Sequence, residues 1–434
     1  MEQSYQRWPF LPSTMRTPEQ NQQWWEHCFL PVLPVENFAQ AGGSTAVTSL
    51  PGNGKSVALE YMVRHTQQWA LHLRYPTVHW PHGARPRIPA KGHLSQIMSI
   101  LALETATHLE AQPQTLAVND LNDTQHEFLA WLVEKYLGRR ALVRLAQRLQ
   151  QTHQATLKLP PQFTDIYPTD TGEGDVWGQI GEAAELAKLL GFAQINLLID
   201  LNEMETSLFR EDLTDLFSRL DFLEHADWLL RSALPQSDVI ESQVLPCVNG
   251  RLYPMRLEYM AADIDTIVSR HVQAATDGRV QTIESLADTA VLERARQEII
   301  TLYGAETLAG WLNWTETLLH LQAGSGGVVR GVDTAVTTYY KRHIHLRLDE
   351  KKQGLWRGPQ FIPLENQPFE MMKMLFEKRG NPAPEALYQI AGSVANLNTI
   401  ANRLRQKVEP IKGKTNVYLH NRRDQGYWLE NFLI

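Results

Sequence analysis

The chain has 434 residues, of which 43% are hydrophobic and 21% are charged. At about 100–200 residues per domain, this length predicts two to four globular domains, and the composition excludes wholesale disorder. The formal net charge of −7 hides a split, because residues 351–434 carry 13 basic and 7 acidic side chains, a net +6, and the rest carries −13. An acidic body with a basic C-terminal segment indicates one module that meets nucleic acid and another with a different task.

The cysteine count and the N-terminal residues favour a reducing compartment. Two cysteines, Cys28 and Cys247, cannot build a disulfide framework. Residues 1–7 lack the basic and apolar regions of a signal peptide, and no window approaches the ~20 apolar residues that span a bilayer. These features predict a soluble cytoplasmic protein without a membrane partner.

The hydrophobic pattern predicts an α/β core that follows an N-terminal arm at residues 1–40. β-prone runs alternate with helical patterns and lie at residues 44–50, 75–80, 195–199, 228–233 and 251–259. Strands that alternate with helices indicate a parallel sheet with helices on both faces. Amphipathic helices at 92–157 form an insertion into this core, which spans residues 41–261.

The chain changes character after the predicted sheet. Residues 262–322 are expected to be almost entirely helical. The segment 323–342 contains the glycine-rich run Gly324–Gly327 near its start, and we expect it to be a flexible linker. Short β-prone runs and basic helices at 343–434 predict a separate α+β domain.

A glycine-rich segment separates the first predicted strand from a helix. Its sequence, Ser49-Leu-Pro-Gly-Asn-Gly-Lys-Ser56, differs from the phosphate-binding pattern G-x-x-x-x-G-K-[ST] only at the first position. In such a loop, backbone N–H groups turn toward the phosphates, the lysine reaches the β/γ oxygens and the hydroxyl binds Mg²⁺. The predicted ATP-binding residues are Ser49, Gly52, Asn53, Gly54, Lys55, Ser56 and Val57. Ser49 in place of glycine either takes an unusual φ, at a cost of ~1 kcal/mol, or marks a loop that binds weakly.

An acidic pair follows the strongest buried-strand signal of the chain. The run Ile195–Ile199 ends in Asp200, and Glu203 comes three residues later. A carboxylate at such a strand end holds Mg²⁺, and a second acid can polarise the attacking water. Asp200 and Glu203 are therefore predicted catalytic residues, and Ser56 with Asp200 the predicted Mg²⁺ ligands.

These two motifs resemble the Walker A and Walker B motifs of the AAA+/STAND division of P-loop ATPases. The resemblance rests on residues 49–56 and 197–203 and extends over residues 40–322. It implies an ATP-dependent switch or assembly protein with a helical lid at 262–322. It also implies that the chain forms homo-oligomers when ATP binds.

The same resemblance implies further roles near the nucleotide. Arg231, on a predicted strand, either corresponds to a reader of the γ-phosphate, which makes it a third predicted catalytic residue, or is an ordinary arginine at a strand end. Arg270, near the end of a lid helix, either acts on a neighbouring subunit or is a solvated helix end. The Pro-Arg pair that the family carries in its lid is absent near Gly304–Thr307, which argues for weak hydrolysis.

The third helical pattern of the basic domain is typical of a DNA-reading helix. Leu397, Ile400, Leu404 and Val408 form one apolar stripe. The remaining surface carries side chains that can pair with base edges or phosphates, namely Thr399, Asn402, Arg403, Arg405, Gln406 and Lys407. A predicted hairpin follows, with Arg422 and Arg423 at a tip suited to phosphate contact.

Residues 343–434 resemble the winged-helix effector domain of response-regulator-type transcription factors. The matching pieces are the helix 369–375, the helix 402–410 and Gly426-Tyr-Trp428. We therefore expect an ATP-binding switch that controls a DNA-binding winged helix and has an effector protein as a possible further partner. Two alternatives stay open. One is a non-catalytic scaffold whose winged helix binds protein, and the other is a DNA-loading ATPase of the replication or transposition type.

Overall fold

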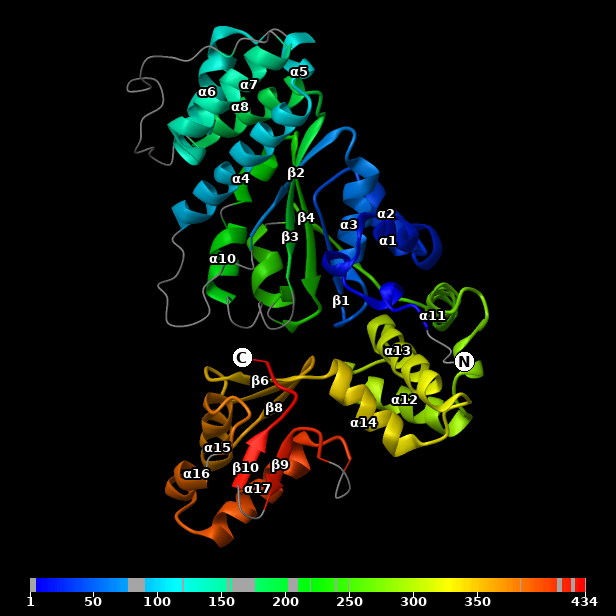
Figure 1. The fold of residues 1–434 in the computed structure, drawn as a ribbon. Helices are drawn as coiled ribbons and strands as arrows, with labels where there is room; N and C mark the ends of the chain where they lie inside the picture. Colours follow the sequence, from blue (N-terminus) through cyan, green and yellow to red (C-terminus); the bar gives the residue numbers. More distant parts are fainter. Residues whose placement is uncertain are drawn as a thin grey trace. The chain divides into compact units, whose positions relative to one another are not determined.

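The structure is a computed structural model in which the chain forms two compact units (Figure 1). The sheet unit comprises Pro31–Ser49 and Gly54–Glu258, and the helical unit comprises Met1–Leu30, Leu50–Asn53 and Tyr259–Ile434. The described residues are 5–76, 90–118, 121–153, 157, 176–201, 210–218, 220–238, 240–248, 250–382, 384–411, 416–422 and 426–433. Each unit is considered by itself.

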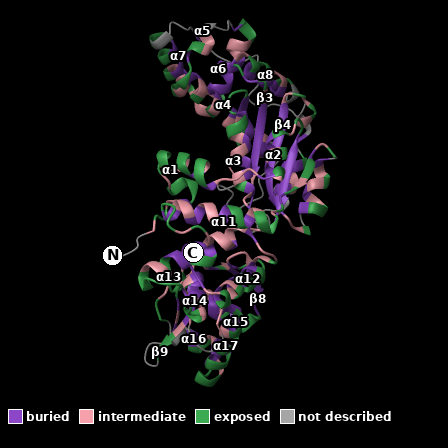
Figure 2. Cartoon of the chain, turned by 90° about the vertical axis from the view of Figure 1, so that its right-hand side faces the viewer, coloured by how far each residue is buried: buried purple, intermediate pink, exposed green. Residues whose placement is uncertain are grey.

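The sheet unit contains a five-stranded sheet with the order β2-β3-β4-β1-β5, in which all neighbours are parallel. The strands are β1 (Thr45–Ser49), β2 (Ala70–Arg74), β3 (Gln194–Asp200), β4 (Trp228–Pro235) and β5 (Tyr253–Arg256). Every residue of β1 and β4 is buried, as expected for central strands covered on both faces (Figure 2). The predicted α/β fold is confirmed.

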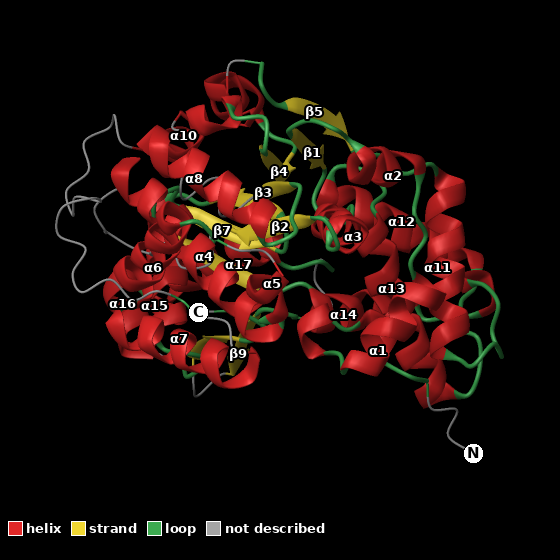
Figure 3. Cartoon of the chain, turned by 90° about the horizontal axis from the view of Figure 1, so that it is seen from above, coloured by secondary structure: helices red, strands yellow, loops and turns green. Residues whose placement is uncertain are grey.

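Helices cover both faces of this sheet. Those of the sheet unit include α2 (Leu33–Gln40), α3 (Lys55–Thr66), α4 (Ala90–Ala111), α5 (Gln114–Val118), α6 (Asp123–Leu137), α7 (Arg139–His153), α8 (Val176–Leu189) and α10 (Arg210–Ser218). Figures 1 and 3 show α2 and α3 on one side of the sheet, and α4, α8 and α10 on the other. The predicted insertion at 92–157 corresponds to α4, α5, α6 and α7.

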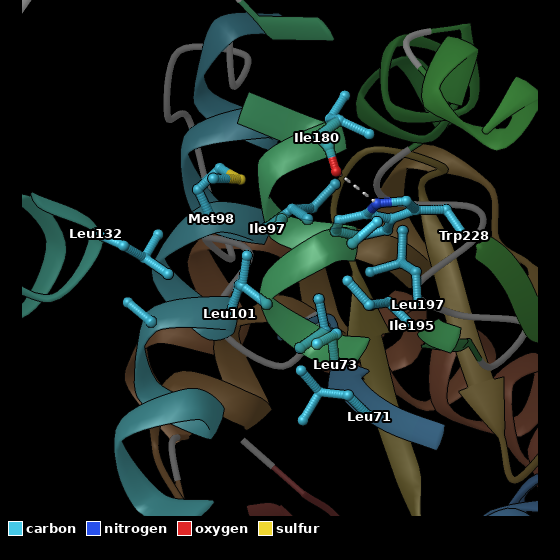
Figure 4. Close-up of a cluster of buried hydrophobic side chains, with 14 of the residues drawn as sticks. Leu71, Leu73, Ile97, Met98, Leu101, Leu132, Ile180, Ile195, Leu197 and Trp228 are labelled. Carbon is cyan, nitrogen blue, oxygen red and sulfur yellow. Dashed lines mark hydrogen bonds between the residues drawn. The ribbon is translucent and has the colours of Figure 1, made fainter. Parts of the chain in front are cut away.

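One face of the sheet packs on α4 and α8. Leu73 and Leu197 are paired in register on β2 and β3, and both belong to the same buried hydrophobic cluster as Leu101 of α4 (Figure 4). Trp228 of β4 is also buried, and its indole N–H donates a 3.2 Å hydrogen bond to the carbonyl of Ile180 on α8. Each such apolar side chain contributes about 1.5–3 kcal/mol when fully buried, so this face stabilises the sheet on which the functional loops sit.

The second strand of the chain lies earlier than the sequence predicts. The prediction was residues 75–80, whereas β2 spans Ala70–Arg74. Tyr75, Thr77, Val78 and Trp80 have high strand propensity, but Pro76 lacks the N–H that a strand ladder needs. The alternation of Leu71 and Leu73, both buried, decides the position of the strand. Residues 77–80 lie outside the described residues.

The helical unit begins with the N-terminal segment and continues after β5. Its N-terminal part has α1 (Pro18–Gln23) and short turns at Trp8–Phe10, Ser13–Met15 and Trp24–Cys28. The later helices are α11 (Ala261–Ala275), α12 (Thr289–Tyr303), α13 (Leu308–Ser325) and α14 (Val332–His343). The predicted N-terminal arm is thus divided, because α2 belongs to the sheet unit.

The segment expected to be a flexible linker, 323–342, is mostly helical. Helix α13 continues to Ser325, and α14 begins at Val332. Tyr339 of α14 is fully buried and stacks on Trp314 of α13, with ring centroids 4.5 Å apart. The glycines that suggested a linker only separate two packed helices.

The C-terminal part of the helical unit is a winged helix. It contains a three-stranded antiparallel sheet of β6 (Leu346–Asp349), β7 (Gly354–Arg357) and β8 (Gln360–Pro363), helices α15 (Asn366–Glu377), α16 (Pro384–Ala391) and α17 (Val394–Val408), and a hairpin of β9 (Leu419–Arg422) and β10 (Gly426–Leu429). One hydrophobic cluster joins α11–α14 to the winged helix. In the part of the chain that the structure describes, no helix has the length and apolar character needed to cross a membrane.

Candidate nucleotide site and DNA-binding face

The phosphate loop connects β1 to α3. Gly52 has φ +79° and Gly54 has φ +71°, in the left-handed region that favours glycine. Gly54 is also the N-cap of α3, whose first residue is Lys55. The N-terminal end of α3 therefore faces the loop, as an anion-binding loop requires.

Ser49, which stands where the motif has its first glycine, is compatible with the loop. It is the last residue of β1, is buried and pairs with Pro235 of β4. Its φ is not positive, so the position demands no glycine and carries no backbone strain. The Lys55 ammonium group, also largely buried, donates a 3.4 Å hydrogen bond to the Ser49 carbonyl.

Asp200 lies beside the phosphate loop at the end of β3. It receives a hydrogen bond from the Ser56 hydroxyl, and the charges of Lys55 and Arg74 act on it. Burial raises the pKa of the Asp200 carboxyl, and the hydrogen bond from Ser56 together with the two positive charges opposes that shift. The structure thus brings together three of the predicted site residues, Lys55, Ser56 and Asp200.

These residues fit a Mg²⁺ ion that is shared with phosphate. A hydroxyl and a carboxylate are hard oxygen ligands of the kind that Mg²⁺ prefers, and it binds through one or two carboxylates plus substrate phosphates. Among the described residues, no group of three or more His, Cys, Asp or Glu could hold a metal by itself. Ser56 and Asp200 would therefore bind the ion only in company with phosphate oxygens. Glu203 lies outside the described residues, and Val57 is half-buried in the first turn of α3.

Arg231 does not lie where a γ-phosphate reader must lie, and that prediction is wrong. It pairs with Thr45 at the start of β1, whereas the phosphate loop follows Ser49 at the end of that strand. Four residues of strand separate the two positions by about 13 Å. The guanidinium group donates hydrogen bonds to the carbonyls of Ala41 and Gly43 and to the hydroxyl of Thr45, at 2.6 Å for the last. Burial lowers the pKa of Arg231 to about 10, and its role is to bind the segment that enters β1.

A polar residue that the sequence analysis missed does lie at the correct end of β4. Gln236 follows Pro235 directly, and its backbone N–H donates a 2.9 Å hydrogen bond to the carbonyl of Ser49. The carboxyl ends of parallel strands meet at the same edge of the sheet, where α/β proteins bind ligands. The signal for this position was the end of the buried run Trp228–Pro235.

Arg270 is engaged inside the helical unit. Its guanidinium group donates a 2.6 Å hydrogen bond to the carbonyl of Phe29. The neighbouring His271 is buried against Trp24 and Phe10, with ring centroids 6.0 and 5.8 Å away. Arg270 thus tethers the N-terminal segment to α11, a packing role that neither earlier interpretation of this residue included.

Helix α17 presents most of its predicted DNA-contacting residues to solvent. The exposed side chains are Thr399, Asn402, Arg403, Gln406 and Lys407. Arg405 differs, because its guanidinium group donates a 3.0 Å hydrogen bond to the Asn421 side chain and lies 5.5 Å from the Tyr427 ring centroid. Arg405 therefore ties α17 to the hairpin. Arg422 is exposed on β9, and Arg423 lies outside the described residues.

Glu409, directly after α17, is a positioning residue that sequence reasoning missed. Its buried carboxylate accepts hydrogen bonds from the backbone N–H groups of Val417, Tyr418 and Leu419, at 2.6, 3.1 and 2.7 Å. Hydrogen bonds to an ionised acceptor are among the stronger ones in proteins. They fix the start of the hairpin relative to the end of α17, and nothing in the local sequence indicates this contact.

No protein-family model matches the chain, and no curated protein matches its sequence. Among solved structures, the chain is similar to the Orc1 protein of Aeropyrum pernix in complex with DNA, with 12% identity, a TM-score of 0.42 and coverage of 100% of this chain and 94% of that chain. It is also similar to Cdc6p from Pyrobaculum aerophilum, with 13% identity, a TM-score of 0.37 and coverage of 98% and 94%. At this identity, the likeness assigns no role to any residue.

Proposed function

We propose that the protein binds ATP with Mg²⁺ at the phosphate loop and uses the nucleotide state to control a DNA-binding winged helix. The observation that carries the proposal is the hydrogen bond between Ser56 and Asp200 beside Lys55, where β1 and β3 end. It joins the two halves of a nucleotide site that lie far apart in the sequence.

Each residue of the site has a separate task in this proposal. The backbone N–H groups that follow Gly52 face the phosphates, and Lys55 neutralises their charge. Ser56 and Asp200 hold Mg²⁺, which when bound offsets the negative charge of the β/γ oxygens. Glu203 polarises the attacking water, and hydrolysis is slow because Arg231 is engaged elsewhere and the lid lacks an arginine at Gly304–Thr307.

DNA binds to the exposed face of α17 and to the hairpin. Asn402 and Gln406 carry amides that can pair with base edges, and Arg403 and Arg422 carry charges for bases or phosphates. The net +6 of residues 351–434 attracts a polyanion, whereas the −13 of the rest does not. DNA binding is thereby focused on one part of the molecule.

The shared core of the helical unit supplies the coupling. Helices α11–α14 and the winged helix contribute to one hydrophobic cluster, so a displacement of the lid helices carries the DNA-binding face with them. ATP-dependent self-association and an effector partner complete the proposal.

The shared hydrophobic cluster of α11–α14 and the winged helix also favours a second candidate, a DNA-loading ATPase of the replication or transposition type. Such an ATPase would load onto DNA of any sequence and would need ATP to do so. This behaviour would distinguish it from a site-specific transcriptional regulator.

Isothermal titration calorimetry with Mg·ATP tests the nucleotide site. We expect wild-type protein to bind, and Lys55→Ala to lose binding by at least tenfold because the buried ammonium group is removed. Lys188→Ala is the matched control, since Lys188 forms exposed ion pairs with Glu185 and Asp227 away from the loop. If wild-type protein binds no ATP, the switch proposal fails and the non-catalytic scaffold replaces it.

A further inference from the structure

The N-terminus of helix α13 is capped by the phosphate loop. The N–H of Leu308 donates a 3.2 Å hydrogen bond to the Asn53 side-chain oxygen, and the N–H of Ala309 donates a 2.9 Å hydrogen bond to the Gly52 carbonyl. The N–H of Gly310 is satisfied within the helix by the Thr307 hydroxyl at 3.3 Å. A helix leaves its first N–H groups without intrahelical partners, and here the loop supplies two of the missing acceptors.

Two separate observations require glycine at position 52. A Cβ atom at this position would lie 2.8 Å from the Cβ of Ala309 and 3.3 Å from the ring of Tyr303, so the helix leaves no room for a side chain. The positive φ of Gly52 makes the same demand independently. Residues Leu50–Asn53 accordingly cluster with the helical unit, although Ser49 and Gly54 on either side belong to the sheet unit.

Asn53 is chemically suited to serve the loop and the helix together. The residue is 7% exposed, so an unpaired amide oxygen there would be costly, and the Leu308 N–H supplies the donor. Asparagine and aspartate are both strong acceptors at helix N-termini. The neutral amide makes this contact without adding negative charge next to a site for phosphates.

The start of α13 contacts the phosphate loop through Gly52 and Asn53, and the segment before it carries no arginine that could do so. The segment Tyr303–Ala309 contains no Arg or Lys, and its one charged residue, Glu306, pairs with Arg296 and accepts a hydrogen bond from Trp311. The contacts of Gly52 and Asn53 therefore link the start of α13 directly to the part of the loop that would close around phosphate.

We propose that Asn53 is a positioning residue that couples phosphate binding in the loop to the order of the first turn of α13. The inference rests on the proposed nucleotide-binding function. Coupling of this kind is reciprocal, so nucleotide must protect the first turn of α13 as much as that turn favours nucleotide binding. Loss of the Asn53 oxygen frees the loop tip and lowers nucleotide affinity, because the pre-organised loop is lost.

Hydrogen exchange and calorimetry on the full chain test this coupling. In wild-type protein, Mg·ATP is expected to slow exchange in the segment 304–312, which contains the amides of Leu308 and Ala309. In Asn53→Ala, this segment exchanges faster, no longer responds to ATP, and the Kd for ATP rises by about three- to tenfold. Asn53→Asp keeps an acceptor oxygen and restores slow exchange in the absence of nucleotide.

Thr307→Ala is the matched control, because it removes a cap from the same helical turn and leaves the loop contacts in place. It is expected to speed exchange in 304–312, and to keep both the ATP response and the wild-type Kd within about twofold. A merely structural role for Asn53 predicts that Asn53→Ala behaves like Thr307→Ala, and that result overturns the inference. Failure of the nucleotide proposal is distinct, because wild-type protein then shows no ATP binding at all.

Discussion

The hydroxyl of Tyr340 on α14 donates a 2.6 Å hydrogen bond to the buried carboxylate of Glu298 on α12. The other carboxylate oxygen of Glu298 pairs with Arg294 at 2.5 Å. Because α14 precedes β6 directly, this contact ties the lid helices to the first strand of the winged helix.

Tyr340→Phe is expected to destabilise the helical unit. The substitution keeps the ring and leaves one oxygen of the buried carboxylate without its donor, which costs about 1–3 kcal/mol. Urea denaturation measures the free energy of unfolding. Tyr388→Phe on α16 is the control, because Tyr388 is 43% exposed and its substitution should change that free energy by less than about 0.5 kcal/mol. Equal stability of the two variants would show that the hydroxyl of Tyr340 has no special role.

Glu316→Gln is expected to be more damaging than the loss of its exposed partner, Arg7. The Glu316 carboxylate is almost fully buried and pairs with Arg7 at 2.7 Å and Arg342 at 2.9 Å, which joins the N-terminal segment, α13 and α14. The substitution removes the buried charge and leaves the Arg342 guanidinium, 23% exposed, without its ionised acceptor, which costs about 1–3 kcal/mol. Arg7→Ala should cost about 1 kcal/mol or less, because the Arg7 side chain is 63% exposed.

The same denaturation experiment contains an internal check. Glu306→Gln removes the surface pair with Arg296, in which the side chains are 36% and 59% exposed, and should be nearly neutral. If Glu316→Gln is as mild as Glu306→Gln, the N-terminal segment is not fastened through this carboxylate.

The sequence was informative where a local pattern determines the structure. The buried run Ile195–Ile199 can only be a central strand of a covered sheet, and its end places Asp200 at a fixed edge. Gly52 and Gly54 likewise mark a loop with positive φ, because few other residues adopt it cheaply. For this reason the closeness of Ser56 and Asp200 was predictable. The strand order was not, because β4 lies between β1 and β3.

The failures concern contacts between distant segments. Arg231 was placed on the correct strand, but its partners are carbonyls of Ala41 and Gly43, which the sequence does not show to be neighbours. Helix α14 looked like part of a linker because the surfaces that bury Tyr339 and Tyr340 come from other helices. The contact between Asn53 and Leu308 is equally non-local, so no motif could reveal it.

Arg403→Ala combined with Arg422→Ala is expected to weaken duplex binding and to flatten its salt dependence. Each lost phosphate contact lowers the slope of log K against log salt by about one unit. Gel-shift titrations across a salt series measure that slope. Arg347→Ala on β6 is the control for the loss of one positive charge, because Arg347 is exposed in the three-stranded sheet and away from α17 in sequence. An unchanged slope in the double variant would place the DNA contact elsewhere or favour a protein-binding winged helix.

Acid is expected to destabilise the protein through its buried histidines. Burial lowers the pKa of His271 to about 4, from the ordinary value of 6.5, and the backbone hydrogen bond to Ile267 only partly opposes this. Burial likewise lowers the pKa of His72 and of His343 to about 4. Between pH 6.5 and 4 the unfolded chain therefore binds protons that the folded chain does not. Stability is complete above pH 6.5 and falls as the pH drops through this window.

The contribution of His271 can be isolated from that of the other histidines. Each such histidine adds up to about 1.4 kcal/mol per pH unit to the slope of the unfolding free energy. His271→Gln should therefore remove up to about 1.4 kcal/mol per pH unit of the histidine-dependent slope between pH 4.5 and 6, measured by urea denaturation at several pH values. His65→Gln, at an exposed position of α3, should leave the slope as in wild-type protein. If the His271 variant keeps the full slope, protonation of His271 does not contribute to the loss of stability in acid.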